Sequence, residues 1–379
     1  NDLQATLSKD KGAFDEMRFI AAHQSYEESR HDRAFDKTDI TEQKEKLSII
    51  SFNLDFDKNF NADRKLLYYG GEFIFNDIKS VAQTRNVITG AITPAGSRYP
   101  NGLNRYTSFS LYTGYKNKLS EAVVINTGLR YNFVHLYSTI EDNSFYGFPF
   151  TSISNEGGAL TGSAGAVIKA NEKLDLHINL STGFRAPNLD DAGKIFDSAP
   201  GVVVVPDADL EPEYAWNIDF SISKEFGDIL HSEFTLFHTW LTNAMVRNDF
   251  LFNGFDSILY LGEPSKVEAM TNSGSARVYG FNINMQVNIL RYLSLKTALN
   301  MTEGYEDNGD PLRHAAPLFG STHLIFKTGG FGADLYTNYN GSKKFEKMAP
   351  SETEKPYLYA ADENGNPWSP GWFTINLKM

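Results

Sequence analysis

The sequence predicts an all-β protein, an antiparallel up-and-down β-barrel that spans a membrane. Three observations predict this fold class: long runs of alternating apolar and polar residues, connections that alternate between short and long, and polar strand faces with few charges. Helical periodicity is nearly absent, so we expect helices to contribute little to the fold.

Composition excludes several other classes of protein. The chain has 379 residues, of which 41% are hydrophobic and 13% aromatic, with no cysteine and a net charge of −12. The apolar fraction excludes a disordered chain, and the lack of cysteine excludes disulfide scaffolds and thiolate metal sites. The acidic balance argues against nucleic acid as a partner, because phosphate binding needs clustered Lys and Arg. The mean hydropathy of −0.36 is that of a soluble protein, but a membrane barrel also scores low because its apolar residues occupy only alternate positions.

The strands are recognised by their period of two. In the segment 123–133 one face carries Val123, Ile125, Leu129, Tyr131 and Phe133, while polar residues, glycine and Arg occupy the other. This alternation predicts a strand with one apolar face. Similar ladders lie at 50–56, 174–180, 214–222, 279–289 and 293–301. We count about 14 strands of this kind, with a further partial strand at 1–8.

The connections between these strands form two series. Short polar turns are expected at 9–13, 61–63, 117–121, 170–173, 226–229, 290–292 and 328–331. Long connections are expected at about 29–41, 80–104, 140–156, 184–210, 249–267, 304–318 and 342–370. A strict alternation of short and long connections predicts hairpins whose long loops all lie at one edge of the sheet.

The polar faces favour a membrane barrel over a soluble β-sandwich. A soluble sandwich exposes Lys, Glu and Arg to water, whereas these faces are mainly Asn, Ser, Gly, Thr and Asp, as expected of a wet lumen. The strands also exceed the usual five or six residues and reach the length that a membrane span requires. A soluble β-protein remains the alternative, and a native polypeptide that needs no detergent would establish it.

Two short motifs carry a resemblance to a known family. They are Gly-Phe-Arg-Ala-Pro at 183–187 and Pro-Asp-Ala-Asp-Leu-Glu-Pro-Glu at 206–213, supported by the segments 272–280 and 314–320. Together these segments resemble the TonB-dependent outer-membrane receptors, and the resemblance covers most of the chain. It implies a barrel of about 22 strands with an N-terminal plug in its lumen. Because no plug, TonB-contacting segment or closing strands are recognised, we expect residues 1–379 to be a partial barrel of about 14–15 strands.

The resemblance also implies a function and a place in the cell. It implies a bacterial outer-membrane protein that contacts outer-membrane lipids, binds a scarce nutrient in its outer loops and imports it by a pull from TonB on the plug. The nutrient expected is a ferric siderophore or another iron chelate. The haem-importing branch carries a His between the two motifs, and residues 186–205 contain none. A passive porin or an adhesin-type barrel is the alternative function.

Arg185 is the first candidate site residue. It lies where a strand is expected to leave the membrane, so we expect it to anchor the following loop through Asp190, Asp191 or Glu213. The other interpretation is a direct contact with the ligand. Pro187 and Pro206 are expected to end the strand pairing because proline donates no backbone hydrogen bond.

Aromatic residues in the long loops are the remaining candidates. Phe145, Tyr146, Phe148, Phe252 and Tyr260 are able to stack on a flat organic ligand, and the other interpretation is packing within the loops and an aromatic girdle at the membrane interface. The sequence gives no reason to expect a cofactor, a resident metal ion or an enzyme: it has no phosphate-binding loop, no nucleophile elbow and no calcium loop of regular spacing.

Overall fold

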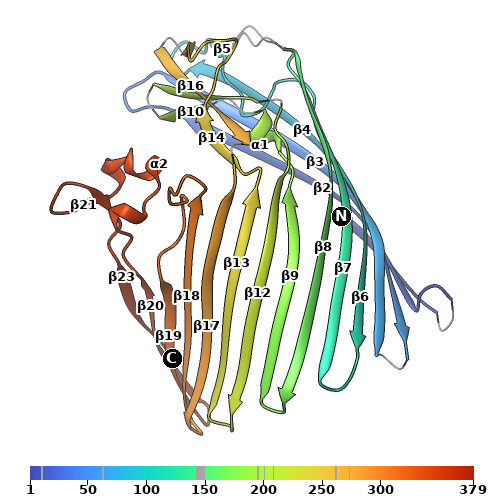
Figure 1. The fold of residues 1–379 in the computed structure, drawn as a ribbon. Coiled ribbons are helices and arrows are strands. Elements are labelled where there is room, and N and C mark those ends of the chain that lie inside the picture. Colours follow the sequence, from blue (N-terminus) through green and yellow to red (C-terminus); the bar gives the residue numbers. More distant parts are fainter. Residues whose placement is uncertain are drawn as a thin grey trace.

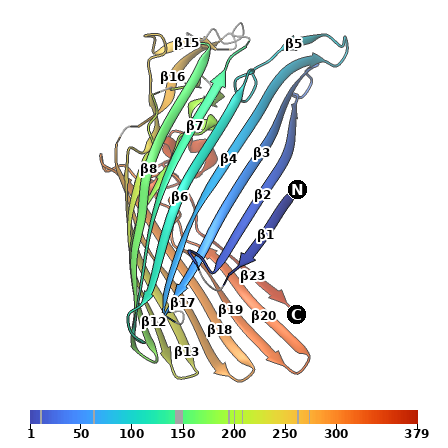
Figure 2. The same cartoon turned by 90° about the vertical axis from the view of Figure 1, so that its right-hand side faces the viewer.

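The computed structural model describes residues 1–9, 12–61, 64–141, 150–193, 196–199, 201–207, 209–260, 263–272 and 274–379. These residues form a sixteen-stranded antiparallel sheet in which fifteen strands follow one continuous path and β5 pairs at the side with β4. The predicted all-β class and the predicted 14–15 strands are both confirmed. Figures 1 and 2 show the sheet as a curved wall of long, tilted strands.

Each strand of the wall pairs with the wall strands that precede and follow it in the sequence, which is the up-and-down arrangement. Among the described residues β1 and β23 are the two edges of this wall. The wall consists of β1 (Asp2–Ser8), β2 (Glu16–Asp32), β3 (Asp39–Phe60), β4 (Lys65–Asn86), β6 (Asn104–Lys118), β7 (Val123–Thr139), β8 (Ser152–Asn171), β9 (Leu174–Arg185), β12 (Glu213–Phe226), β13 (Leu230–Thr242), β17 (Ala276–Leu290), β18 (Leu293–Glu306), β19 (Phe319–Thr328), β20 (Phe331–Asn340) and β23 (Trp372–Lys378).

The remaining elements belong to the long loops, which lie at the end of the wall opposite the short turns, at the top of Figure 1 and, for α2 and β21, at its left side. They are β5 (Ile92–Pro94), α1 (Leu189–Ala192), β10 (Phe196–Ala199), β11 (Val202–Val205), β14 (Met245–Asp249), β15 (Ser257–Tyr260), β16 (Glu263–Asn272), η1 (Phe345–Lys347), α2 (Pro350–Thr353), η2 (Pro356–Leu358), β21 (Ala360–Ala361) and β22 (Pro367–Trp368). Five of them, β10, β11, β14, β15 and β16, form a small second sheet over the wall.

Two expected long loops are shorter than the sequence suggested, and the one expected at about 80–104 begins only after Asn86, where β4 ends. The connection predicted at about 29–41 spans only 33–38, because β2 and β3 continue past the end of their apolar alternation. Cross-strand ion pairs support this extension: Lys44 Nζ lies 2.5 Å from Glu27, and Arg85 of β4 lies 2.6 Å from Glu42 of β3. Opposite charges on facing strands stabilise pairing where apolar contacts are lacking.

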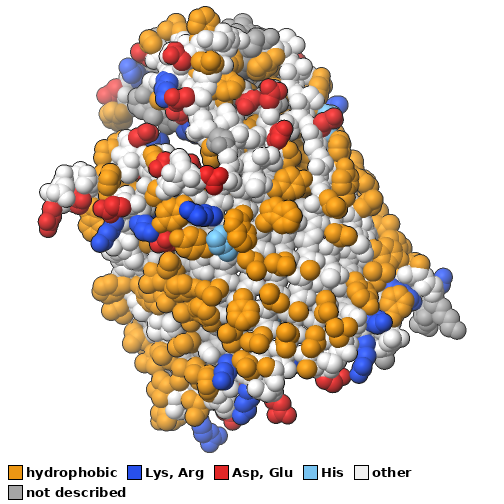
Figure 3. Space-filling model, viewed as in Figure 1, with side chains coloured by type: hydrophobic (Ala, Val, Ile, Leu, Met, Phe, Trp, Pro, Cys, Tyr) orange, Lys and Arg blue, Asp and Glu red, His pale blue; other side chains and the backbone are white. Residues whose placement is uncertain are grey.

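The outer face of the wall is apolar. Phe52, Phe109, Leu180 and Trp216 all lie on this face and are among the exposed hydrophobic residues. Figure 3 shows hydrophobic side chains spread over the strands, with Lys, Arg, Asp and Glu gathered toward the two ends. Such a band is what a lipid-facing barrel wall requires.

Strand length exceeds what a membrane crossing needs. β3 and β4 have 22 residues each, or about 70 Å at about 3.3 Å per residue, against the 9–11 residues of a spanning strand. Both strands therefore project well beyond the membrane on the long-loop side. No helix among the described residues is both long and apolar enough to cross a membrane.

The buried apolar cores lie among the loops, because one face of the wall meets lipid and the other meets the lumen. One core consists of Leu136, Ile153, Leu189, Ala192, Leu210 and Met245. The other consists of Val203, Val205, Phe252, Val267 and Ala269, which come from β11, β16 and the connection between β14 and β15. The loops are thus packed structures, able to hold side chains in fixed positions.

Candidate functional site

Strand pairing brings the two sequence motifs together. β9 and β12 are neighbours, and their last pair toward the loops joins Arg185 of the first motif to Glu213 of the second. Leu180 and Trp216 on the same strands are exposed on the outer face. Because successive side chains alternate between faces, Arg185 and Glu213 lie on the inner face, beneath the loops.

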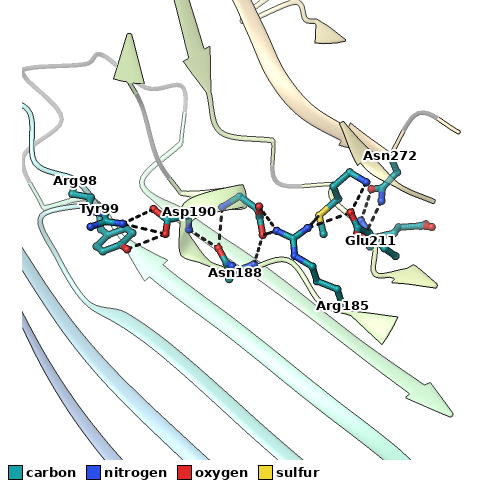
Figure 4. Close-up of polar contacts among 10 residues, drawn as sticks. Arg98, Tyr99, Arg185, Asn188, Asp190, Glu211 and Asn272 are labelled. Atoms are coloured by element: carbon teal, nitrogen blue, oxygen red, sulfur yellow. Dashed lines mark hydrogen bonds and ion pairs between the residues drawn. The ribbon is translucent and has the colours of Figure 1, made fainter. Parts of the chain in front are cut away.

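Arg185 is the centre of a polar clasp (Figure 4). Its Nη2 lies 2.6 Å from each carboxylate oxygen of Asp191, and its Nη1 lies 3.2 Å from Glu213 Oε1. Nη1 also lies 3.8 Å from the sulfur of Met245, whose backbone N–H donates to Glu213 Oε1 at 2.8 Å. One guanidinium thereby links the end of β9, the start of β12, helix α1 and strand β14.

The short helix α1 presents Asp191 to Arg185. The Asn188 side chain caps this helix by accepting hydrogen bonds from the backbone N–H groups of Asp190 and Asp191 at 2.8 and 3.1 Å. The Asp191 carboxylate in turn accepts from the backbone N–H of Asn188 at 3.0 Å. This reciprocal capping box satisfies orphan N–H groups and fixes the rotamer of Asp191.

The neighbouring Asp190 faces a different loop. Arg98 Nη2 lies 3.4 Å from its carboxylate oxygens, and the Tyr99 hydroxyl donates to it at 3.3 Å. The Tyr99 backbone N–H donates to Ser80 Oγ of β4 at 3.2 Å. Of the three anchoring partners expected for Arg185, Asp191 and Glu213 are in contact with it, and Asp190 instead connects α1 to the loop after β5.

Asn272 joins the second motif to the segment 272–280. Its side-chain amide donates to the carbonyl oxygens of Glu211 and Asn243 at 2.9 and 2.7 Å, and its Oδ1 accepts from the Glu211 N–H at 2.7 Å. Asn243 Nδ2 donates to the Glu211 carboxylate at 3.2 Å. These bonds tie the loop before β12 to the loop between β13 and β17.

An apolar layer supports the clasp from below. Leu189 and Ala192 of α1, Leu210 of the second motif and Met245 are all buried in one cluster with Leu136 and Ile153 of the wall. Pro187 is fully buried as well. Burying these residues contributes on the order of 1–3 kcal/mol each, so the loops pack on the wall as well as bonding to it.

A second clasp, at the other side of the loop region, is a buried ion pair. Lys343 Nζ lies 2.8 Å from Glu352 of α2, and both side chains are about nine-tenths buried. The Glu352 carboxylate also accepts from the backbone N–H groups of Ala349 at 2.9 Å and His314 at 3.4 Å. Burial raises the pKa of Glu352, but these hydrogen bonds outweigh burial and hold the pKa below its usual value. The ion pair closes the loop before β23 on itself, and the hydrogen bond from His314 joins this loop to the loop before β19.

The aromatic ligand candidates are placed unevenly. Phe252 is only 7% exposed and packs in the core of the second sheet, and Tyr260 is partly buried against the same core. Phe145, Tyr146 and Phe148 lie outside the described residues. The core that holds Phe252 and Tyr260 is separate from the core of α1 and Met245 beside Arg185, and a role of these aromatic residues in ligand binding stays a prediction.

Sequence reasoning missed several members of the clasp. Met245 and Arg98 carry no motif signal, and only the fold brings them to Arg185 and Asp190. Asn272 begins one of the supporting segments, which was the available signal for it.

Burial, together with the nearby charge of Asp190, raises the pKa of Tyr99, so its hydroxyl stays a hydrogen-bond donor. Among the described residues no group of three or more His, Asp or Glu is placed to hold a metal ion.

The geometry therefore defines a membrane β-barrel wall whose outer loops are clasped together over the lumen. Residues 2–379 match the family described as TonB dependent receptor-like, beta-barrel, and the chain belongs to this family. The predicted family and the predicted location in the bacterial outer membrane are thereby confirmed.

The individual relatives that match the chain share little sequence identity with it. The chain is 28% identical over 208 residues to transferrin-binding protein A of Neisseria meningitidis serogroup B. This alignment covers 52% of this chain and 20% of that protein. Among solved structures it is similar to the copper transporter OprC (TM-score 0.76, 12% identity, 99% of this chain and 55% of that one). It is also similar to the siderophore receptor PirA of Acinetobacter baumannii (TM-score 0.72, 14% identity, 99% of this chain and 55% of that one). A third similar structure is the ferric yersiniabactin uptake receptor FyuA of Yersinia pestis (TM-score 0.68, 13% identity, 99% of this chain and 52% of that one). The chain thus spans about half the length of these solved relatives.

Proposed function

We propose that this chain is the barrel wall of a receptor that imports a ferric siderophore or another iron chelate, energised through TonB. The family match over residues 2–379 carries the proposal. It is supported by the titles of the similar structures, which include siderophore and ferric yersiniabactin receptors, and by the name of the transferrin-binding relative.

The clasp fits this proposal as the device that keeps the ligand-binding loops in place. Arg185 connects four segments while its own side chain is 45% exposed, so it acts as a positioning residue for the loop 186–212. Phe145, Tyr146 and Phe148 stay proposed ligand contacts on sequence grounds, together with Tyr260. Phe252 is buried in the core of the second sheet and supports that sheet from within.

Coupling to TonB is part of the proposal. It requires a plug within the longer protein, and the coding sequence around this chain is the direct check. An open reading frame that encodes no plug would favour the alternative, a passive porin or an adhesin-type barrel.

Uptake of radioactive iron tests the transport function. Iron-starved cells that lack the gene would be supplied with single ferric siderophores, ferric citrate or haem, and complemented with the full-length gene. We expect saturable uptake of at least one chelate that disappears when either this gene or the TonB gene is deleted. Equal uptake of every iron source with and without the gene would overturn the iron proposal, and non-saturable uptake that survives loss of TonB would indicate a porin.

A further inference from the structure

The outer face of β3, β4 and β6 changes character abruptly above the apolar band. Phe52 of β3 faces Phe73 of β4, and the next outward pair is Ile50 with Phe75. One step further the pair is Ser48 with Asp77, and the step after that pairs Lys46 with Lys79. Figure 2 shows these strands running side by side toward the long-loop edge.

Lys46 and Lys79 thus occupy directly facing positions on neighbouring strands, and each carries a positively charged ammonium group. Like charges in such a cross-strand pair are destabilising, because the Cβ atoms lie only about 5 Å apart. Lys79 is exposed and forms no ion pair with any described residue. Lys46 shares Glu27 with Lys44, at 3.1 and 2.5 Å.

The outer-face patch around Lys46 and Lys79 carries an excess of positive charge, although the protein as a whole is acidic. Arg105 of β6 lies on the same outer face and sits 3.6 Å from Asp77. Four cations, Lys44, Lys46, Lys79 and Arg105, therefore meet two carboxylates, Glu27 and Asp77, whereas the chain as a whole has a net charge of −12. The excess of positive charge is local and calls for an anion from outside the chain.

The height of the patch identifies the anion. Lys46 lies four residues beyond Ile50, which is about 13 Å along the strand and about 9 Å along the membrane normal at a tilt of about 45°. This is the level of lipid headgroups, and lysine side chains reach down to it along their apolar stems. Long loops of outer-membrane barrels are extracellular, so the headgroups at this level belong to the outer leaflet.

We propose that Lys44, Lys46, Lys79 and Arg105 form a binding site for the phosphate-bearing headgroup of an outer-leaflet lipid. The acyl chains of that lipid lie on the apolar band around Phe52 and Phe73, and its phosphate lies between Lys46 and Lys79, where it removes their repulsion. Basic clusters at the membrane surface bind phosphorylated headgroups in this way. The site depends on the outer-membrane location and is independent of the nutrient that the receptor carries.

Lipid retention is the first test. The protein, folded in a neutral detergent, would be titrated with bisphosphorylated lipid A and followed by native mass spectrometry. We expect the double variant Lys46→Gln/Lys79→Gln to bind about tenfold more weakly, the loss expected for weakening charge-assisted contacts by about 1.4 kcal/mol. The matched control Lys169→Gln/Lys173→Gln removes the same charge at the short-turn end and should bind as the wild type does.

Parallel titrations separate the sources of phosphate. Lipid A from which both phosphates have been removed should bind the wild type about as weakly as bisphosphorylated lipid A binds the double variant. Inorganic phosphate at the same concentrations should not compete. Competition by inorganic phosphate would overturn the lipid assignment in favour of a soluble anion, and an equal loss in the control variant would show nonspecific charge attraction.

Thermal unfolding supplies a second readout that a merely structural role would not produce. In neutral detergent without lipid A the double variant should unfold at a higher temperature than the wild type, because the lysine repulsion is gone. With saturating lipid A the order should reverse, because only the wild type is stabilised by binding. A variant that is less stable under both conditions, or equally stable under both, would overturn the proposal.

Discussion

Replacing Arg185 with alanine is the sharpest test of the loop clasp. The change removes two 2.6 Å contacts to Asp191 and one 3.2 Å contact to Glu213. It leaves both carboxylates with one backbone N–H donor each, from Asn188 and Met245. Neither carboxylate is therefore orphaned, and the loss is that of the ion pairs alone.

The magnitude follows from the exposure of the groups. Hydrogen bonds to charged groups contribute about 1.5–3 kcal/mol when shielded from water. Asp191 is 9% exposed but Arg185 is 45% exposed, so solvent screening reduces this contribution. We expect the loop 186–212 to lose about 1–2 kcal/mol of local stability, which raises amide exchange there roughly 5- to 30-fold.

Hydrogen exchange with peptide resolution, in detergent, measures this loss. Arg185→Lys should recover only part of the protection, because an ammonium cannot reproduce the forked contact with Asp191. Arg98→Ala is the matched control, since it releases two longer contacts of 3.4 Å to Asp190 and the packing on the Tyr99 ring but leaves Arg185 in place, and it should raise exchange less. A loss of ligand affinity in Arg185→Ala with unchanged exchange in 186–212 would refute the anchoring role and assign Arg185 to the ligand.

Four further predictions concern the second clasp and the wall. Glu352→Ala should strip protection from the loop 341–371 and cost about 3–5 kcal/mol locally, because it leaves Lys343 buried without its partner, whereas Lys343→Met with Glu352→Leu should cost less. Since the pKa of Glu352 is depressed in the folded protein, its contribution to stability should be complete above pH of about 4.5 and decline as the pH falls through the lower folded value. A protection factor for this loop, corrected for the pH dependence of intrinsic amide exchange, that stays constant down to pH of about 3 would contradict that sign. Gly280→Ala should lower the unfolding midpoint by the equivalent of about 1–3 kcal/mol, because the added Cβ overlaps the Met301 carbonyl and the Phe237 ring, while Gly183→Ala, which meets open space, serves as the control. Leu180→Arg on the lipid face should cost about 2–4 kcal/mol of stability in liposomes, and Ser181→Arg on the lumen face should cost clearly less; equal losses would place both faces wrongly.

The wall of the protein was predictable because its signal is local. Alternation at 123–133 and 279–289 needs only the two faces of one strand to meet different solvents, and β7 and β17 include these segments. The same rule failed at 29–41, where charged side chains hid a strand pairing that depends on ion pairs between β2, β3 and β4. A charge has no preferred face until its partner is placed, so periodicity cannot detect it.

The candidate site was only partly predictable. The motif residues Arg185 and Glu213 are joined by strand register, which sequence alternation supports, and Asp191 was one of three partners left open. The choice between Asp190 and Asp191 is made by α1, whose Asn188 cap directs Asp191 toward Arg185 and leaves Asp190 for Arg98. The burial of Phe252 was not predictable, because an aromatic residue in a loop has the same sequence signal whether it is buried or exposed.

The sequence by itself determined the class of fold, the side of the sheet on which the long loops lie and the family, because each is written in residues close together in the chain. Only the tertiary structure decided which loops are clasped together, which aromatic residues are buried and where facing strands place two lysines opposite each other. Those features depend on contacts between segments far apart in the sequence. Their energies arise from burial and from distances between charges, which exist only once the wall has formed and brought the loops together.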